Sequence, residues 1–243
     1  MIEIHSHILP GIDDGARDVQ EAAALLALLK KQGVSSVVLT PHFYPDRQLL
    51  KDFLEQREKA FLTLSNAVEA SEDRGEISGI RLVLASETLI SDILLAYDRL
   101  EALCISGTEY LLLELPYARE WSGSVFRLID RLIAKFGFTP VIAHVERYEA
   151  VRHKPEKNLD ELIDLGCLLQ MNIAALVDQS TRRYAMKLVK KGYIDLIGSD
   201  CHNLTTRAPR YHEFFEVVEK NRLNGYLTQW EKASKRVLSD KLP

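Results

Sequence analysis

The sequence predicts an α/β protein whose strands and helices alternate and close into a distorted TIM-like (β/α)7 barrel. Short apolar runs alternate with longer amphipathic runs along the chain, which favours parallel strands joined by helices. Runs such as 110–113 and 140–143 are almost continuously apolar, as in strands that are buried on both faces. Side chains able to bind metal follow nearly every predicted strand, where barrel enzymes place their sites.

Composition sets the class of protein. The chain has 243 residues, of which 47% are hydrophobic and 27% charged, and no linker-like stretch interrupts it, so we expect one domain over residues 1–243. A net charge of -4 without a block of Lys and Arg argues against nucleic-acid binding. We also expect no signal peptide and no membrane insertion. Three widely spaced cysteines, Cys104, Cys167 and Cys201, indicate a reducing compartment, so we expect a cytoplasmic protein.

The first half of the chain contains three predicted strands. Alternation over residues 1–7 predicts a strand with Glu3, His5 and His7 on one face. The motif Asp-Val-Gln-Glu at 18–21 is typical of a capping box and begins a helix that runs to about residue 31. The other elements expected here are a strand at 34–40 stopped by Pro41, a helix from 48 to about 71, a polar loop at 71–79, a strand at 81–85 and a helix at 89–103.

The second half repeats the alternation. Its predicted strands are 109–113, 139–143, 167–171 and 194–198. Its predicted helices are 124–136, 159–165, 181–191, 210–221 and 227–238. The chain therefore has seven predicted strands, and closure into a barrel related to the (β/α)8 type follows from their alternation with helices.

The opening strand carries the motif His5-Ser6-His7. Two imidazoles two residues apart at a strand end can reach one metal ion together. The turn that follows carries Asp13 and Asp14, and the residues alone leave open which of the two is a ligand. Taken alone, the motif fits a plain strand end and turn equally well.

The residues that follow the later predicted strands favour a metal site over a plain strand end and turn. Six of the seven predicted strands end in side chains that bind metals: His5 and His7, His42, Glu87, Glu114, His144, and Asp200 with His202. Because the carboxyl ends of barrel strands meet on one face, we expect these side chains to converge. The two other histidines, His153 and His212, fall in polar segments and are expected at the surface.

This mixture of ligands limits which metal ions can bind and which substrates are favoured. Imidazoles with carboxylates suit Mn²⁺, Zn²⁺ or Fe, and the share of oxygen ligands favours manganese. About nine ligands exceed the need of one ion and fit two or three ions that share carboxylates, a centre that activates water. About six positive charges on three such ions would exceed about four carboxylate charges, which favours an anion such as phosphate. Arg147 and Arg207 follow ligands closely, and we expect them to bind phosphate oxygens.

The ordered motifs resemble a known family. MIEIHSHILPGIDDGA, TPHFYP, ASET, LLLELP, IAHVERY and GSDCHN look like the PHP (polymerase and histidinol phosphatase) superfamily. They are most similar to its bacterial protein-tyrosine phosphatases of the CpsB/CapC type, over nearly the whole chain. The resemblance implies the PHP fold, a trinuclear and typically manganese-dependent site, and hydrolysis of phosphotyrosine. The expected substrate is a phosphotyrosine protein, commonly a bacterial tyrosine autokinase that controls capsule or exopolysaccharide export.

The resemblance also implies a role for each site residue. It places His5, His7, Glu87 and Asp200 around one ion, Glu114 and His144 with the shared Glu87 around a second, and Asp14, His42 and His202 around a third. Arg147 and Arg207 would bind the phosphate. The family pattern favours Asp14 over Asp13, and the carboxylate at Glu114, where superfamily relatives often have histidine, agrees with the phosphatase branch.

Other functions remain to be weighed. Cys201 and Arg207 have the Cys-x5-Arg spacing of cysteine-dependent tyrosine phosphatases, but the loop lacks glycines and Asp200 would raise the pKa of the thiol. A PHP enzyme could act on a small ester such as histidinol phosphate, whereas a polymerase-linked exonuclease would need a basic surface. A non-catalytic metal protein would lack ligands, and none is missing. Segments 43–47 and 116–121 fit an aromatic mouth or ordinary loop packing.

Overall fold

The strands form two parallel sheets in a computed structural model that describes residues 1–70, 75 and 77–239. These residues form the strands β1 (Ile2–Ser6), β2 (Ser36–Leu39), β3 (His42–Phe43), β4 (Arg81–Leu84), β5 (Glu87–Leu89), β6 (Tyr110–Glu114), β7 (Thr139–Ile142), β8 (Leu168–Asn172) and β9 (Leu196–Gly198). One sheet has the order β1-β2-β4 and the other β3-β5-β6-β7-β8-β9. Every pairing is parallel, as the strand–helix alternation predicts.

Backbone hydrogen bonds join the end of the second sheet to the start of the first. The N–H of Asp200 donates to the carbonyl of His5 at 2.8 Å, and the N–H of His7 donates to the carbonyl of Cys201 at 2.9 Å. The strand predicted at 34–40 corresponds to β2, and after Pro41, which has no N–H to donate, the chain continues as β3. The strand predicted at 81–85 likewise continues as β5. The distorted α/β barrel is therefore confirmed, with two of its seven strands interrupted.

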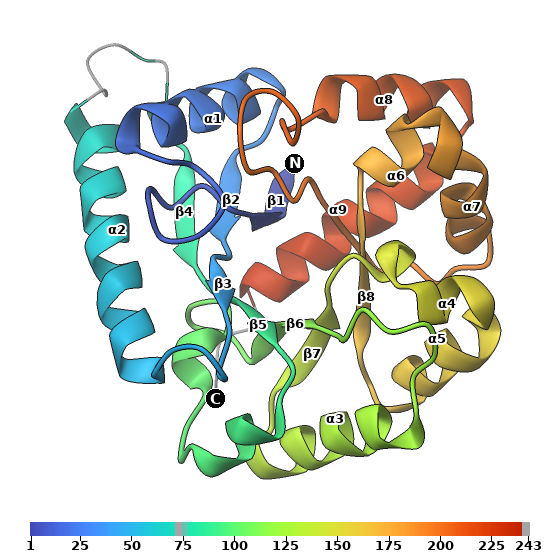
Figure 1. Cartoon of the computed structure of the whole chain (residues 1–243). Coiled ribbons are helices and arrows are strands. Elements are labelled where there is room, and N and C mark those ends of the chain that lie inside the picture. Colours follow the sequence, from blue (N-terminus) through green and yellow to red (C-terminus); the bar gives the residue numbers. More distant parts are fainter. Residues whose placement is uncertain (71–74, 76, 240–243) are drawn as a thin grey trace.

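Helices surround the strands (Figure 1). They are α1 (Val19–Lys31), α2 (Leu50–Ala70), α3 (Gly123–Phe136), α4 (Glu149–His153), α5 (Pro155–Asp164), α6 (Ala174–Val177), α7 (Gln179–Lys190), α8 (Tyr211–Lys220) and α9 (Asn224–Ser239). Asp18 caps α1 by accepting the N–H of Glu21 at 2.8 Å, as the capping motif predicts. Most of the loop predicted at 71–79 cannot be judged, because residues 71–74 and 76 lie outside the described residues.

One predicted helix is wrong, and three short helices were not predicted. The single helix expected at 89–103 is two 3₁₀ helices, η2 (Asp92–Ala96) and η3 (Glu101–Leu103), because Leu89 belongs to β5 and Tyr97 has extended backbone. The short helices η4 (Val145–Arg147), α4 and α6 were not expected, since each is too short to show a helical period in the sequence.

The alternation expected in β1 is also wrong. The pairing of β1 with β2 shifts register between Glu3 and Ser6, and such a bulge moves one residue to the other face. The buried Glu3 carboxylate accepts hydrogen bonds from Tyr211 Oη of α8 and from the Ser199 N–H, both at 3.0 Å. Glu3 therefore contacts the outer helix layer, whereas His5 and His7 point to the other candidate ligands.

An apolar core fills the barrel below these candidate ligands. Side chains of the strands, of the residues directly after β4 and β7, and of the segment before β6 form one cluster with Val237 of α9: Ile4, Val38, Val83, Ala85, Ile105, Tyr110, Leu112, Val141, Ala143 and Leu196. α9 crosses behind the strands in Figure 1, and its Trp230 Nε1 donates to the carbonyl of Ile194 at 2.9 Å. The helices cover the outside of the barrel through a second, larger cluster. No helix of the described residues is long and apolar enough to cross a membrane.

Candidate metal centre

The nine predicted ligands converge at the carboxyl ends of the strands. Each belongs to at least one of four groups whose ligand atoms lie within 4.8 Å of one another: His7, Asp14, His42 and His202; His5, His7 and Glu87; His5, His144 and Asp200; and His42, Glu87 and Glu114. His153 and His212 lie elsewhere, with side chains 43% and 81% exposed, as predicted. The strand-end positions therefore predicted correctly which side chains come together.

His5 has a defined tautomer. Oε1 of Gln170 accepts the backbone N–H of His144 at 2.7 Å, so this atom is the amide oxygen and not the nitrogen. The same oxygen lies 3.2 Å from Nδ1 of His5, which must therefore carry the proton. Nε2 of His5 consequently presents a lone pair, the form in which imidazole binds a metal.

His7 is held in the same tautomer by Asp13. Oδ2 of Asp13 lies 2.8 Å from Nδ1 of His7, and the carboxylate also accepts the N–H groups of Gly15 and His42. Although burial opposes ionisation, the charge and hydrogen bond of His7 lower the pKa of Asp13. An ionised Asp13 requires a proton on Nδ1 of His7, so Nε2 is the nitrogen that His7 presents to the cluster, with a lone pair when the ring is neutral.

Asp14 occupies a different position from Asp13. Its Oδ1 lies 3.3 Å from Nε2 of His202 and 3.5 Å from Nε2 of His42. Asp14 thus joins the ligand group, whereas Asp13 supports His7, and the geometry separates the two aspartates that the sequence left open. Gly15 lets the turn pass close to β1, because a Cβ there would lie 2.0 Å from the carbonyl oxygen of His7.

Glu87 lies at the middle of the cluster. Its Oε1 is 2.7 Å from Nε2 of His144, and its Oε2 is 3.2 Å from Nε2 of both His5 and His7 and 3.1 Å from Nδ1 of His42. Burial would raise the pKa of Glu87, but the surrounding histidines hold it well below its usual range. A carboxylate with each oxygen toward different imidazoles has the arrangement of a bridging ligand.

The pKa of Glu114 is shifted in the opposite direction from that of Glu87. Burial and the neighbouring charge of Glu87 raise the pKa of Glu114 to about 7. Its Oε1 lies 3.8 Å from Nε2 of His144. A cation between these residues would favour the ionised form of both carboxylates.

Two candidate ligands have left-handed backbone. His144 has a φ of 33° and Asp200 a φ of 54°, and Arg222 is the one other non-glycine residue of the described chain with positive φ. Non-glycine residues in this conformation concentrate at functional sites. The surroundings hold Asp200 in place, because Asn172 Nδ2 donates to its Oδ2 at 2.9 Å and Gln170 Nε2 donates to Asn172 at 3.0 Å.

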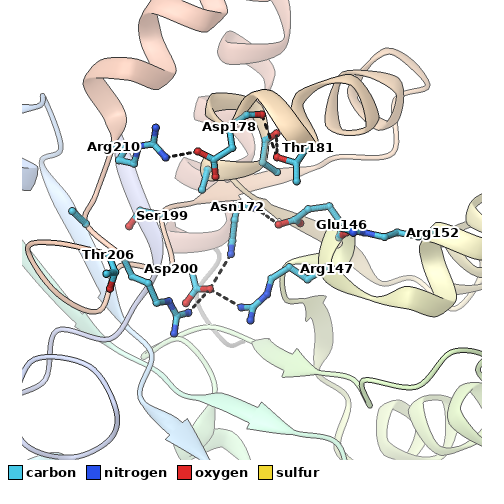
Figure 2. Close-up of a pocket in the computed structure, with 14 residues that line it drawn as sticks. Glu146, Arg147, Arg152, Asn172, Asp178, Thr181, Ser199, Asp200, Thr206 and Arg210 are labelled. Atoms are coloured by element: carbon cyan, nitrogen blue, oxygen red, sulfur yellow. Dashed lines mark hydrogen bonds and ion pairs between the residues drawn. The ribbon is translucent and has the colours of Figure 1, made fainter.

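Arg147 and Arg207 meet at the same carboxylate oxygen. Nη1 of Arg147 and Nη2 of Arg207 donate to Oδ2 of Asp200 at 3.0 Å and 2.8 Å. Figure 2 shows Arg147 and Asp200. Both arginines line a pocket of about 250 Å³ beside the cluster. The two predicted phosphate-binding residues thus lie together at the edge of the candidate metal centre.

The arrangement fits a metal centre. Nδ1 of His202 lies 3.0 Å from the carbonyl of Asp200, so it donates and Nε2 carries the lone pair. Two facing lone pairs cannot form a hydrogen bond unless a proton lies between them. Several buried atoms of the cluster lack hydrogen-bond partners: His42 Nδ1, Glu87 Oε2, His144 Nδ1, Asp200 Oδ1 and His202 Nε2. A cation satisfies such converging nitrogen and oxygen donors, and this donor set suits Mn²⁺, Zn²⁺ or Fe.

Cys201 is unsuited to nucleophilic attack. It is fully buried, and burial, with the charge of Glu3, raises the pKa of its thiol well above the usual range. The thiolate that a cysteine-dependent phosphatase needs is therefore disfavoured.

Each of the two segments suspected of forming an aromatic mouth places one ring against a candidate ligand. Trp121 is buried in the loop, whereas Tyr117 is 55% exposed. Tyr117 stacks on His144 with ring centroids 6.0 Å apart, and Tyr44 stacks on His42 at 5.0 Å. Aromatic rings therefore do lie against two of the candidate ligands.

Sequence reasoning missed the residues that hold the ligands. Gln170 and Asn172 occupy alternate positions of β8, whose other residues are apolar, so both face the cluster. Two polar residues at period 2 in a buried strand were the available signal.

The fold and the cluster define a class: an α/β barrel with a candidate metal centre at the carboxyl ends of its strands. Comparison with known proteins identifies the family. Residues 1–235 match the family described as "Capsular polysaccharide synthesis, CpsB/CapC". The chain therefore belongs to the CpsB/CapC family, and the resemblance drawn from the motifs is confirmed.

Individual relatives support the assignment to this family. The chain is 30% identical over 237 residues to the tyrosine-protein phosphatase CpsB of Streptococcus pneumoniae, covering 90% of each chain. It is 28% identical over 233 residues to the tyrosine-protein phosphatase YwqE of Bacillus subtilis, covering 90% of this chain and 84% of that protein. A crystal structure from work on YwqE and CpsB, described as "unique metal-dependent tyrosine phosphatases", superposes with a TM-score of 0.79 and 24% identity. It covers 100% of this chain and 96% of the other, and it shares the fold.

Proposed function

We propose that this protein is a metal-dependent protein-tyrosine phosphatase. The observation that carries the proposal is the meeting of Arg147 and Arg207 at Asp200, on the edge of the candidate metal cluster. Two guanidinium groups beside several metal ligands suit a phosphate ester, whose oxygens accept paired hydrogen bonds. The names of the relatives, tyrosine-protein phosphatases CpsB and YwqE, support tyrosine as the carrier of the phosphate.

We assign two or three ions to the centre, with Mn²⁺ the best match to its oxygen ligands and Zn²⁺ or Fe as alternatives. The assigned ligands are His5, His7, Asp14, His42, Glu87, Glu114, His144, Asp200 and His202. When bound, such ions supply Lewis-acid stabilisation of the phosphate and activation of water. Glu87, which faces four of the histidines, is the ligand best placed to be shared.

The protein's own groups prepare the site for the ester. Gln170 and Asp13 hold the imidazoles of His5 and His7 with their Nε2 lone pairs toward the centre. Arg147 and Arg207 orient the phosphate and stabilise the charge that develops on its oxygens. Because both guanidinium groups are already positioned by Asp200, little reorganisation is needed when the ester binds.

We infer the biological setting from the family. The expected substrate is a phosphotyrosine protein, such as a bacterial tyrosine autokinase that controls capsule or exopolysaccharide synthesis. The expected location is the cytoplasm, on the basis of the spacing of the three cysteines. We further propose that residues 1–243 form one phosphatase domain, which agrees with the coverage of the relatives.

The test is hydrolysis of a phosphotyrosine peptide by the purified protein, with histidinol phosphate as a small-ester comparison. We expect higher kcat/KM on the peptide. Turnover of histidinol phosphate alone would keep the phosphatase chemistry and overturn the protein substrate. Absence of turnover on both, in protein shown to contain metal, would favour a non-catalytic metal protein.

A further inference from the structure

Tyr117 is an unusual residue for the surface of this protein. It follows β6, and 55% of its surface is exposed although the neighbouring Trp121 and Tyr148 are buried. Its ring centroid lies 5.2 Å from that of Tyr148, which contacts Trp121 at 5.1 Å. Tyr148 is itself fixed, because its hydroxyl accepts the N–H of Leu115 at 2.8 Å. An exposed ring is thus held on a rigid aromatic base.

The ring of Tyr117 also lies over the candidate metal centre. It stacks on His144 with centroids 6.0 Å apart and an interplanar angle of 28°. Its hydroxyl interacts with the carboxylate of Glu114. Tyr117 therefore lies against two of the proposed ligands while much of its ring stays exposed.

The position of Arg147 connects this ring to the phosphate. The guanidinium carbon of Arg147 lies 5.5 Å from the centroid of Tyr117. In an aryl phosphate the ring is bonded to a phosphate oxygen, so a phosphate held by Arg147 must place its ring nearby. Tyr44 is placed differently, because the guanidinium beside its ring, at 4.7 Å, is that of Arg47.

The pocket on the other side of Arg147 is a poor site for an aromatic ring. Figure 2 shows it bounded by charged and polar side chains, among them Glu146, Arg152, Asp178 and Arg210. None of the described residues that line it is aromatic. Placing a phenyl ring there would remove charged groups from water without compensation.

We propose that Tyr117 forms an aryl subsite, in which its exposed ring packs against the ring of the phosphorylated substrate. This inference rests on the proposed function and deepens it, because it gives a structural reason for preferring aryl esters over alkyl esters. Offset or edge-to-face packing of two rings accounts for the preference. The ring is oriented by its contacts with His144 and Tyr148, which do not depend on the Tyr117 hydroxyl.

Binding of two phosphonates tests the subsite without requiring turnover. The dissociation constants of phenylphosphonate and methylphosphonate are measured by calorimetry on metal-loaded wild type, Tyr117→Phe and Tyr117→Leu, after bound metal has been determined in each. We expect Tyr117→Phe to keep the preference for phenylphosphonate. Tyr117→Leu should lose about threefold to tenfold of it, with methylphosphonate binding unchanged. Tyr117→Met repeats the measurement if the leucine variant fails to retain metal.

Arg152→Ala is the matched control, because it alters the charged pocket and leaves Tyr117 in place. We expect it to keep the phenyl preference. An unchanged preference in Tyr117→Leu, a loss confined to Arg152→Ala, or a wild type without any preference would overturn the subsite. Tyr117-dependent binding by a wild type that hydrolyses no phosphate ester would overturn the proposed function and leave the aryl subsite standing.

Discussion

Nε2 of His5 lies 3.2 Å from Nε2 of His7, and Oε2 of Glu87 lies 3.2 Å from both nitrogens. Gln170 and Asp13 occupy the Nδ1 positions, so in the neutral form of both rings two lone pairs face each other in a fully buried place. Such a contact is unfavourable unless a cation lies against it. This relationship is the strongest physical reason to expect metal, and several predictions depend on it.

Glu87 should be the most sensitive ligand. Glu87→Gln removes the charge from a side chain that faces His5, His7, His42 and His144 at 2.7–3.2 Å. We expect loss of bound manganese and of phosphotyrosine hydrolysis, measured by metal analysis and by phosphate release. The control is Glu149→Gln, an exposed carboxylate that should change neither. Full activity in Glu87→Gln would contradict the assigned centre.

Arg147 should act on the ester rather than on the metal. Arg147→Ala is expected to lower kcat/KM by about 100- to 1000-fold, the usual effect of losing one donor to a developing charge. Metal content should stay at the wild-type level. Arg183→Ala, on the exposed side of α7, should leave kcat/KM unchanged. Equal values for wild type and Arg147→Ala would remove Arg147 from the site.

Gln170 should control metal affinity from outside the ligand set. Gln170→Leu removes the acceptor of His5 Nδ1 and of the His144 N–H. Loss of such a supporting hydrogen bond weakens metal binding by about 10- to 100-fold. The measurement is a titration with Mn²⁺, with Gln179→Leu at the start of α7 as control. Wild-type affinity in Gln170→Leu would show that the tautomer of His5 does not depend on this amide.

Tyr211 should contribute to stability through Glu3. Tyr211→Phe leaves a buried carboxyl without the hydroxyl that now lies 3.0 Å away, so we expect unfolding free energy to fall by about 1–3 kcal/mol. Urea denaturation measures the change. Tyr193→Phe removes a hydroxyl that bonds to Asp160 at the surface and should cost less than about 0.5 kcal/mol. Equal stability of the two variants would argue against the buried bond.

Cys201 should be dispensable for catalysis. Its thiol is buried and its pKa is raised, so Cys201→Ala is expected to keep the kcat/KM of the wild type on a phosphotyrosine peptide. Thermal denaturation checks that the variant is folded. A folded, metal-containing Cys201→Ala protein without activity would support the cysteine mechanism.

The sequence predicted the barrel and the convergence of the candidate ligands because both follow from local pattern. Strand–helix alternation specifies parallel pairing. The carboxyl ends of parallel barrel strands lie on one face, so polar residues that follow buried strands come together there. The bulge in β1 was not predictable in this way, because it depends on pairing with β2 and on Tyr211 far along the chain. The helix expected at 89–103 failed because its apolar spacing also fits short 3₁₀ turns.

The residues that hold the candidate ligands in place could not be predicted, for a different reason. Gln170 reaches a histidine 165 positions away in the sequence, and its role exists only when β8 lies in the barrel. Asp13 and Asp14 are adjacent and chemically identical, so only geometry separates the one that supports His7 from the one that faces His42 and His202. Ligands can thus be predicted from residue type and strand end, whereas their supports depend on tertiary contacts.

Metal removal and restoration tests the central claim most directly. Hydrolysis of a phosphotyrosine peptide is followed in protein treated with a chelator, then dialysed and supplied with Mn²⁺, Zn²⁺ or Fe²⁺ in turn. We predict that chelation abolishes turnover and that Mn²⁺ restores it most fully. Turnover that persists after metal analysis shows the protein to be free of metal would contradict the account.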